Sequence, residues 1–284
     1  MNEHFYAVIM AGGGGTRLWP LSRQNRPKQM LRLVSNRSLF QMATDRLEGL
    51  FPADHIYVVT VADQATELQK QSPNIPAENY ILEPMPRGTA SVVGLAAVVL
   101  QKRDPQAVMA VLTADHFIEN VAGFQQILIS ADQLAQRGYL VTLGIQPSFP
   151  STGYGYIQRG EPLDESSQQD GFRVVKFKEK PNEELAREML RRGDHLWNSG
   201  MFIWRVDRIQ EEFRRQMPEL ARILDQIAAS WSTAWQTETL KKLWPQIKPQ
   251  TIDYGIMEHA EHVAVLPGAG LGWSDVGSWD SLFD

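Results

Sequence analysis

Cysteine is absent from the 284 residues of the sequence, which excludes disulfide scaffolds, cysteine-ligated zinc and thiol nucleophiles. No stretch approaches the roughly 20 apolar residues that a membrane-spanning helix needs. The first residues, Met-Asn-Glu-His, lack the basic region of a signal peptide, so we expect a cytoplasmic protein. A formal net charge of -5 leaves no general basic surface, which argues against nucleic-acid and anionic-membrane partners.

The most informative segment that is present is an apolar strand followed by a glycine run. Residues Ala7–Ala11 predict a buried parallel strand, because a short apolar run bounded by glycine suits a strand covered on both faces. Glycine lets the backbone turn tightly and expose consecutive N–H groups to an anion. The run comprises Gly12, Gly13, Gly14 and Gly15, followed by Thr16. Arg17 and Lys28 add positive charge, so the segment predicts a phosphate-binding turn.

Two common phosphate-binding motifs do not match this segment. The dinucleotide-binding fingerprint needs a third glycine at the position of Arg17. A Walker loop needs Gly-Lys-Ser or Gly-Lys-Thr directly after the turn, where this sequence has Gly15-Thr16-Arg17. The sequence therefore indicates neither ATP hydrolysis nor a dinucleotide-dependent oxidoreductase.

The segment and its continuation, LWPLSRQNRPKQ, resemble the motif of the sugar-1-phosphate nucleotidyltransferases, and in particular the mannose-1-phosphate guanylyltransferase branch. The resemblance extends from Ala7 to Trp279. It implies one nucleotidyltransferase domain over residues 1–284, with a nucleotide-binding half at 1–146 and a sugar-phosphate-binding half at 147–284. It also implies that the glycine run and Thr16 bind the nucleotide.

The first half of the sequence alternates apolar runs with segments of helical periodicity. Strands are predicted at Tyr6–Ala11, Ile56–Val61, Tyr80–Leu82, Val108–Thr113 and Leu140–Gly144, and helices at Ala90–Lys102 and Gly123–Arg137. This order predicts an α/β fold in which an open, mostly parallel, Rossmann-like sheet is flanked by helices on both faces. Ligands of such sheets bind at the carboxyl ends of the strands.

The pattern changes after Pro150. TGYGYIQRG and GFRVVKFKEKP predict two strands of a mixed or antiparallel pair, separated by the polar segment Asp164–Asp170. We expect this part to form a smaller, β-containing lobe that binds the sugar.

Two helices are predicted further along, at 182–193 and 207–229. Asn182 and Asp207 are suitable N-cap residues, and Gly193 is a suitable C-cap. Packing positions are expected for Trp231, Trp235 and Trp244.

Two aspartates are candidate ligands of a divalent cation. Asp115, in LTADHFI, follows a predicted buried strand and could by itself be a helix cap or a turn residue. Next to a polyphosphate-binding turn it becomes a candidate Mg²⁺ ligand, because Mg²⁺ prefers one or two carboxylates and takes its other oxygens from phosphate and water. The family resemblance pairs Asp115 with Asp275 of GWSDVGSWDSL as the metal ligands. Asp280, in the same segment, is a weaker candidate.

The segment EPMPRGTAS, from Glu83 to Ser91, precedes a helix that is predicted to begin near Thr89. A loop that places Arg87 at a helix N-terminus could contact phosphate or the nucleobase. The resemblance implies that Arg87 and Gly88 face the base. In the alternative, structural interpretation, Glu83 and Arg87 form an ion pair with each other.

Three motifs in the second half resemble the sugar-phosphate site of the family. TGYGYI supplies Gly153 and Gly155, whose backbone could contact a hexose ring. FKEKP supplies Glu179, suited to accept hydrogen bonds from two hydroxyls, and Lys180, suited to the phosphate of the sugar. LWNSGMFIW supplies Asn198, which offers a donor and an acceptor ahead of an apolar strand. Without the other motifs, Glu179 and Lys180 could be an exposed charge pair with no function.

The segment DYGIMEHA also resembles the family. An amphipathic helix that packs Tyr254, Ile256 and Met257 explains most of this segment without chemistry. Whether Asp253 or Glu258 contacts substrate stays open at this point.

The resemblance implies Mg²⁺-dependent transfer of GMP from GTP to α-D-mannose 1-phosphate, giving GDP-mannose and pyrophosphate. The sugar phosphate is largely a dianion at neutral pH, so a direct in-line displacement needs positioning and charge neutralisation rather than a general base. Arg17 and Lys28 would neutralise the nucleotide phosphates, and Lys180 would guide the sugar phosphate.

Two alternatives and one property stay open from the sequence. A related enzyme could use another nucleoside triphosphate or hexose 1-phosphate, because one hydroxyl distinguishes the sugars. A non-catalytic regulatory subunit could bind the nucleotide sugar without turnover. The oligomeric state also stays open, with a homodimer as one candidate.

Overall fold

The computed structural model describes residues 2–13, 18–23, 26–163 and 171–277. The strands are β1 (Phe5–Met10), β2 (Ile56–Val61), β3 (Tyr80–Glu83), β4 (Val108–Thr113), β5 (Phe117–Ile118), β6 (Leu140–Ile145), β7 (Tyr156–Pro162), β8 (Phe172–Lys178), β9 (His195–Arg205), β10 (Val263–Pro267) and β11 (Trp273–Ser274). The helices are α1 (Leu39–Asp45), α2 (Ala62–Gln71), α3 (Thr89–Arg103), α4 (Val121–Gln136), α5 (Glu183–Arg192), α6 (Val206–Gln216), α7 (Pro218–Ser230) and α8 (Gln236–Leu243). Short helical turns occupy Lys28–Met30, Ala53–His55, Ala77–Asn79, Trp244–Gln246 and Asp253–Met257.

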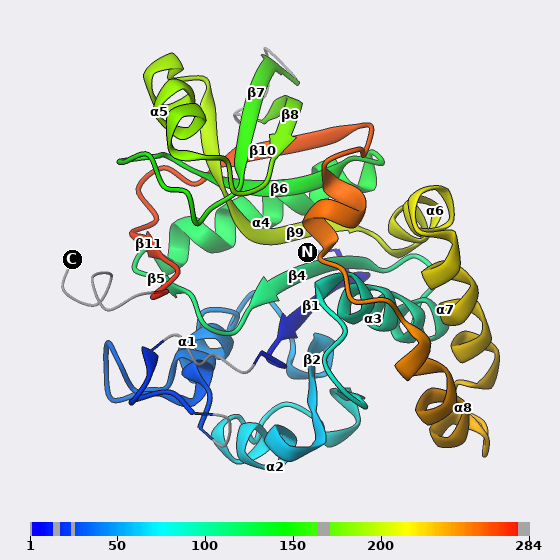
Figure 1. Ribbon diagram of the computed structural model, residues 1–284. Coiled ribbons are helices and arrows are strands. Elements are labelled where there is room, and N and C mark those ends of the chain that lie inside the picture. The colour runs from blue at the N-terminus through cyan, green and yellow to red at the C-terminus, as the bar shows by residue number, and fades with distance from the viewer. Residues whose placement is uncertain (1, 14–17, 24–25, 164–170, 278–284) are drawn as a thin grey trace.

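A nine-stranded sheet in the order β3-β2-β1-β4-β9-β6-β10-β8-β7 organises the chain (Figure 1). Strands β3, β2, β1 and β4 run parallel to one another, as the alternation of strands and helices predicts. Strand β9 runs antiparallel between β4 and β6. Beyond β6, β10 is parallel and β8 and β7 are antiparallel. The α/β class is confirmed, but the sheet is mixed rather than mostly parallel, because β9, β8 and β7 run antiparallel to their neighbours.

Most predicted elements lie within one or two residues of the observed ones. The strands predicted at Ile56–Val61 and Val108–Thr113 coincide with β2 and β4. TGYGYIQRG and GFRVVKFKEKP supply β7 and β8, which pair antiparallel as expected. Helix α5 has Asn182 as its N-cap, with the side chain accepting from Leu185 N, and Gly193 as a left-handed C-cap.

The helix predicted at 207–229 is two helices, α6 and α7, that meet at Met217. Pro218 begins α7 because proline lacks an N–H and is tolerated only in the first helical turn. The predicted cap at Asp207 is wrong, since the helix begins one residue earlier and Arg205 is the N-cap.

Two further expectations need correction. Trp235 is 67% exposed, whereas Trp244 is fully buried as expected. The segment that begins at Asp253 is one turn of π-helix rather than a regular amphipathic helix. Its Ile256 is buried, but Tyr254 is 40% exposed.

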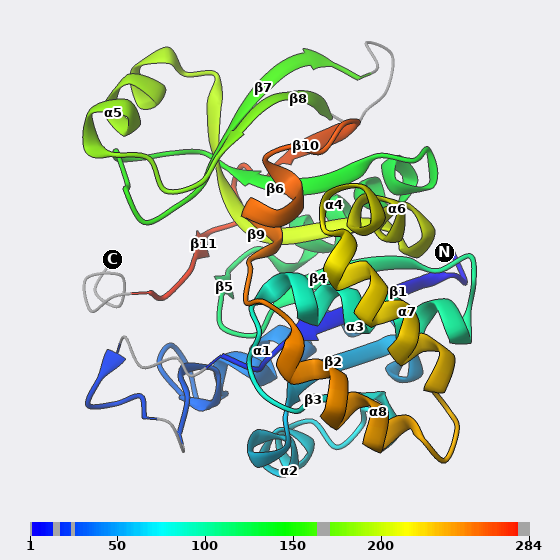
Figure 2. The ribbon, with the colours of Figure 1, turned by 45° about the vertical axis from the view of Figure 1, so that its right-hand side comes forward.

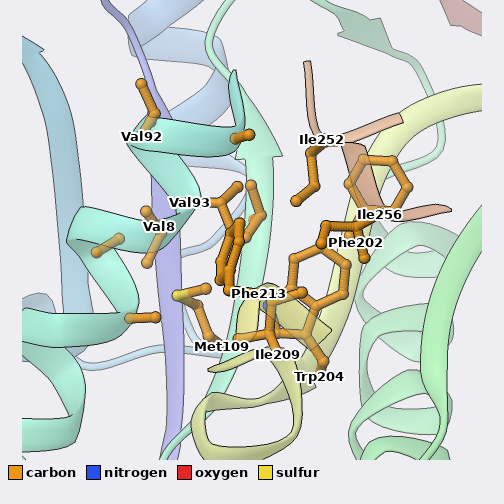
Figure 3. Packing of buried hydrophobic residues seen from close by; sticks show 14 of the residues in the cluster. Val8, Val92, Val93, Met109, Phe202, Trp204, Ile209, Phe213, Ile252 and Ile256 are labelled. Atoms are coloured by element: carbon orange, nitrogen blue, oxygen red, sulfur yellow. The ribbon is translucent and has the colours of Figure 1, made fainter. Parts of the chain in front are cut away.

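Each face of the sheet has its own hydrophobic core, because side chains alternate along the strands. On one face, Val8 and Met109 pack with helices α3, α6 and α7. Figure 3 shows Val93 of α3 near Phe213 of α6 in this core. Alternate residues of the same strands pack with α1 and α4 on the other face. These two cores fix the strand ends from which the site loops emerge.

A separate two-stranded sheet, β5 with β11, lies beside the carboxyl ends of the central strands (Figures 1 and 2). Trp273 pairs with Ile118 and Ser274 with Phe117, so the pair is antiparallel. It joins the loop after β4 to a segment near the end of the chain. Among the described residues, no helix is long and apolar enough to cross a membrane.

Candidate functional site

A pocket of about 440 Å³ lies at the carboxyl ends of β1, β3 and β4, where ligands of open α/β sheets bind. Its lining includes Gly12, Gly13, Glu83, Gly88 and Asp115. A wider groove of about 1360 Å³ lies between residues 20–33 and α2, but its lining contains neither of the candidate metal aspartates, whereas Asp115 lines the smaller pocket. The smaller pocket is therefore the candidate nucleotide site.

The start of the glycine run lies directly against Glu83. A Cβ at Gly12 would lie 2.5 Å from Glu83 Oε1, so a larger residue would displace the carboxylate. Buried Gln29, which the sequence analysis missed, fixes this turn because its Nε2 lies 3.0 Å from Ala11 O and 3.2 Å from Gly13 O. The predicted residues Gly14, Gly15, Thr16 and Arg17 lie outside the described residues, as do Asp280 and the segment 164–170.

Lys28 joins the two candidate metal aspartates. Its side chain is only 2% exposed, and its Nζ lies 2.8 Å from Asp115 Oδ2. The same Nζ donates to the main-chain oxygen of Asp275. Two carboxylate residues that are remote in sequence therefore meet at one ammonium group.

The small sheet explains why these aspartates meet. Asp115 lies two residues before β5, and Asp275 lies one residue after β11. Because the two strands are antiparallel, the start of β5 and the end of β11 lie at the same end of the pair. Sequence spacing alone could not show this.

Asp115 and Asp275 fit a divalent cation of the Mg²⁺ type. Mg²⁺ needs only one or two protein carboxylates when phosphate and water complete its shell. No group of three or more His, Asp or Glu side chains in the described ranges could enclose a metal ion. The donor set therefore suits a cation that keeps water or phosphate oxygens in its shell rather than a fully enclosed metal.

Arg46, at the end of α1, fixes the loop that contains Asp115. This buried guanidinium donates from Nη2 to Thr113 O and from Nη1 to His116 O, both at 3.0 Å. These two carbonyl groups flank Asp115 in the sequence. Burial lowers the pKa of Arg46 to about 10, with the nearby Asp115 opposing the shift, so the group stays cationic at neutral pH. No motif marks Arg46 in the sequence.

His116 adds a neutral contact on the other side of this loop. Burial holds its pKa well below the ordinary value, and Trp273 Nε1 donates to its Nδ1 at 3.2 Å. The loop after β4 is therefore bonded to β11 through side chains as well as through the strand pair.

Glu83 and Arg87 do not form the ion pair that the structural interpretation anticipated. Arg87 Nη2 donates to Pro245 O at 2.8 Å, and the side chain does not line the pocket. Glu83 is buried, and its Oε2 has no hydrogen-bond donor within the described part of the chain. Burial raises the pKa of Glu83 to about 7, partly offset by a hydrogen bond from the Arg87 backbone. Gly88 lines the pocket at φ +83, where a Cβ would lie 2.2 Å from Gln250 O.

The residues of the expected sugar site come together beside β9. A Cβ at Gly155 would lie 2.4 Å from Glu179 Oε2 and 3.3 Å from Asn198 Cβ. Lys180 Nζ donates to Glu179 Oε1 at 2.7 Å, and Lys180 has a left-handed φ of +43. Such a conformation is uncommon for a side-chain-bearing residue and is found at functional sites. Gly153 is exposed and bonds through its N–H to Ser151 Oγ at 3.2 Å.

Asn198 lies within β9 rather than ahead of a strand, and its amide is largely occupied. Its Oδ1 accepts from Thr142 Oγ1 at 3.2 Å and from Gly200 N at 3.1 Å. Its Nδ2 donates to Asp253 Oδ1 at 2.8 Å. Because an amide nitrogen has two hydrogens, one N–H is left for a ligand.

Asp253 and Glu258 support this cluster from the π-helical segment. Burial and the charge of Glu179 raise the pKa of Asp253 to about 6. Glu258 Oε1 accepts from the backbone N–H of Glu179 at 3.1 Å. Both residues, whose contacts the sequence left open, therefore border the expected sugar site.

Comparison with known proteins identifies the family. The nucleotidyl transferase family model matches residues 6–284. The chain belongs to the nucleotidyl transferase family. A structure described as mannose-1-phosphate geranyltransferase from Thermus thermophilus is 33% identical, with a TM-score of 0.87, and the match covers 99% of this chain and 79% of that one.

Curated members of the nucleotidyl transferase family are similar over almost the whole chain. Mannose-1-phosphate guanylyltransferase 2 of Escherichia coli O157:H7 is 40% identical over 290 residues, which covers 98% of this chain and 59% of that protein. The mannose-1-phosphate guanylyltransferase of Klebsiella pneumoniae is 39% identical, with the same coverage of both chains. The chain thus spans about three fifths of the length of these curated relatives.

Removing the Arg46 guanidinium should destabilise the nucleotidyl transferase fold. Arg46→Met leaves two partly buried carbonyl oxygens without this donor, so we expect a loss of about 2 kcal/mol in the free energy of unfolding. Arg37→Met is the matched control, because Arg37 forms an exposed ion pair with Asp45 worth at most about 1 kcal/mol. Urea denaturation measures both, and equal losses would contradict the role of Arg46.

Glu83 should make stability fall as pH rises. The folded-state pKa of about 7 lies above the ordinary 4.5. Between pH 4.5 and pH 7 the folded state therefore retains a proton that the unfolded state has released. Glu83→Gln removes this effect. The free energy of unfolding of the variant minus that of the parent should therefore rise by on the order of 2 kcal/mol from pH 5 to pH 8. The same change at exposed Glu78 is the control. A pH-independent difference at Glu83 would refute the assignment.

Proposed function

We propose that this chain transfers GMP from GTP to α-D-mannose 1-phosphate and releases pyrophosphate, giving GDP-mannose. The observation that carries the proposal is the contact of one buried ammonium, Lys28 Nζ, with Asp115 and Asp275 at the carboxyl ends of the strands. A cation and two carboxylate residues at that edge suit a reaction between phosphate groups. The names of the similar proteins support GTP and mannose 1-phosphate as the substrates.

The position of Glu83 gives a physical reason why this pocket would select guanine over adenine. The Watson–Crick edge of guanine presents two neighbouring N–H donors, at N1 and N2, which match the two oxygens of a carboxylate. Adenine has an acceptor at N1, and two acceptors facing each other repel, so adenine would bind the same carboxylate less well. Because Glu83 lines the pocket with one oxygen still open, it is the proposed contact for the base.

The phosphate chemistry requires charge neutralisation rather than proton transfer. The sugar phosphate is largely a dianion at neutral pH and can attack the α-phosphate directly, without a covalent enzyme intermediate. Lys28 would contact the α-phosphate or the incoming phosphate, and Arg17 would neutralise the departing pyrophosphate. The glycine turn from Gly12 to Thr16 would supply backbone N–H donors.

Asp115 and Asp275 are the proposed ligands of Mg²⁺. When bound, Mg²⁺ would supply positive charge to the α-phosphate. Lys28 would keep both residues close together before a cation and nucleotide bind, because it already contacts each of them. Arg46 would keep the Asp115 loop in place through its two carbonyl contacts.

The sugar-phosphate half would bind mannose 1-phosphate through the cluster beside β9. Glu179 would accept hydrogen bonds from ring hydroxyls, and the remaining N–H of Asn198 would donate to one. Lys180 would contact the phosphate, which requires it to exchange its bond with Glu179 for the ligand. The backbone of Gly155 and Gly153 would pass close to the hexose ring.

A pyrophosphate-release assay tests the proposal on the chain of residues 1–284. The four common nucleoside triphosphates are crossed with mannose 1-phosphate and glucose 1-phosphate, with and without Mg²⁺. We expect release with GTP, mannose 1-phosphate and Mg²⁺ together, and its loss in the double variant Asp115→Asn, Asp275→Asn. Preference for another donor or hexose would replace the substrates proposed here. Binding of GDP-mannose without release would support a non-catalytic subunit instead.

The sugar-side cluster predicts a selective change in one Michaelis constant. Asp253→Ala removes the carboxylate that bonds the Asn198 amide, so that amide loses its orientation. We expect the KM for mannose 1-phosphate to rise about tenfold, as for loss of one charged hydrogen bond, while the KM for GTP changes less than about twofold. Asp207→Ala, on the outer helix α6, is the control. An equal rise in both constants would place Asp253 outside the sugar site.

A further inference from the structure

Tyr154 connects the sugar-side loop to one of the proposed metal ligands. Its hydroxyl donates to Asp275 Oδ1 at 2.9 Å. Its ring packs edge-on against Trp197, with centroids 4.9 Å apart, and against Trp273, with centroids 5.6 Å apart. Two indole rings thus fix the phenol that orients Asp275.

The Asp275 carboxylate is held asymmetrically. Its Oδ1 accepts from the Tyr154 hydroxyl and from Gly277 N, at 2.9 Å and 3.0 Å. Its main-chain oxygen accepts from Lys28. No donor from the described residues bonds to Oδ2, so the hydrogen bonds select Oδ2 as the oxygen that remains for a cation.

The residue after Tyr154 belongs to the proposed sugar site. Gly155 O accepts from Asn198 N at 2.8 Å, and a Cβ at Gly155 would lie 2.4 Å from Glu179 Oε2. One short loop therefore contacts the sugar-binding cluster through its backbone and the metal-binding carboxylate through a side chain. A hydrogen bond to a metal-ligating carboxylate commonly sets its orientation and its affinity for the metal.

We propose that Tyr154 is a positioning residue, which presents Asp275 Oδ2 to the divalent cation and couples cation binding to binding of the sugar phosphate. This inference rests on the proposed function. By thermodynamic linkage, mannose 1-phosphate should tighten cation binding, and the cation should tighten binding of mannose 1-phosphate by the same factor.

Binding of Mn²⁺ as a probe, followed by EPR of the free ion, tests this without turnover. Tyr154→Phe removes only the hydroxyl, and we expect it to weaken Mn²⁺ binding about tenfold. Mannose 1-phosphate should tighten Mn²⁺ binding in the parent chain and have no effect in the variant. Tyr156→Phe is the matched control, because that buried hydroxyl bonds to Ser151 O at 3.0 Å and not to Asp275, and it should bind Mn²⁺ like the parent.

A double-mutant cycle keeps the proposal testable if the variant is destabilised. In an Asp275→Asn chain, Tyr154→Phe should have no further effect on Mn²⁺ binding, whereas additive effects would overturn the proposal. Unchanged Mn²⁺ binding in Tyr154→Phe would overturn it as well, and so would a parent chain that binds no Mn²⁺. Because EPR measures binding in the absence of GTP, these outcomes are distinct from a failure of pyrophosphate release.

Discussion

A buried ammonium group is the constraint on which the carboxyl edge of the parallel strands depends. Lys28 is almost fully removed from water, where a charge is costly unless oxygen atoms surround it. The Asp115 carboxylate and the Asp275 carbonyl supply those oxygens from two segments that the β5–β11 pair brings together. Because buried Lys28 needs these oxygens, it holds the Asp115 and Asp275 segments together before any ligand binds. Such preorganised charge is what transfer between phosphate groups requires.

Around this contact, polar residues outside any motif fix the backbone of the site. Gln29 bonds the glycine turn, Arg46 bonds both sides of Asp115, and Tyr154 bonds Asp275. Gln29 and Tyr154 direct their donors to protein oxygens, as do the two terminal nitrogens of Arg46. Glu83 is the contrasting case, since one of its oxygens has no donor within the described ranges and the pocket lies beside it. The polar residues around Lys28 thus differ: some hydrogen-bond the backbone or side chains of the site, whereas Glu83 keeps an oxygen without a donor from the described residues.

The sequence predicted the parallel strands well, because short apolar runs bounded by turn residues are local signals. It could not place β9 between β4 and β6, since strand order depends on contacts remote in sequence. The prediction of one continuous helix at 207–229 was wrong, because Pro218 begins a second helix. Proline is a local signal, so the sequence contained the information for this break. Arg46 has no local signal, because its role depends on carbonyl groups that the fold brings to it. The sequence also predicted a free amide at Asn198, but Asp253 accepts one of its N–H groups. Only the folded chain brings these two residues together.

The most direct test of the account is a crystal structure of the chain with GDP-mannose and Mg²⁺. The account predicts that the diphosphate lies at Lys28, with the cation between Asp115 and Asp275. The guanine should contact Glu83, and the hexose should lie against Glu179 and Asn198. A diphosphate bound away from Lys28 and both aspartates would contradict the central claim.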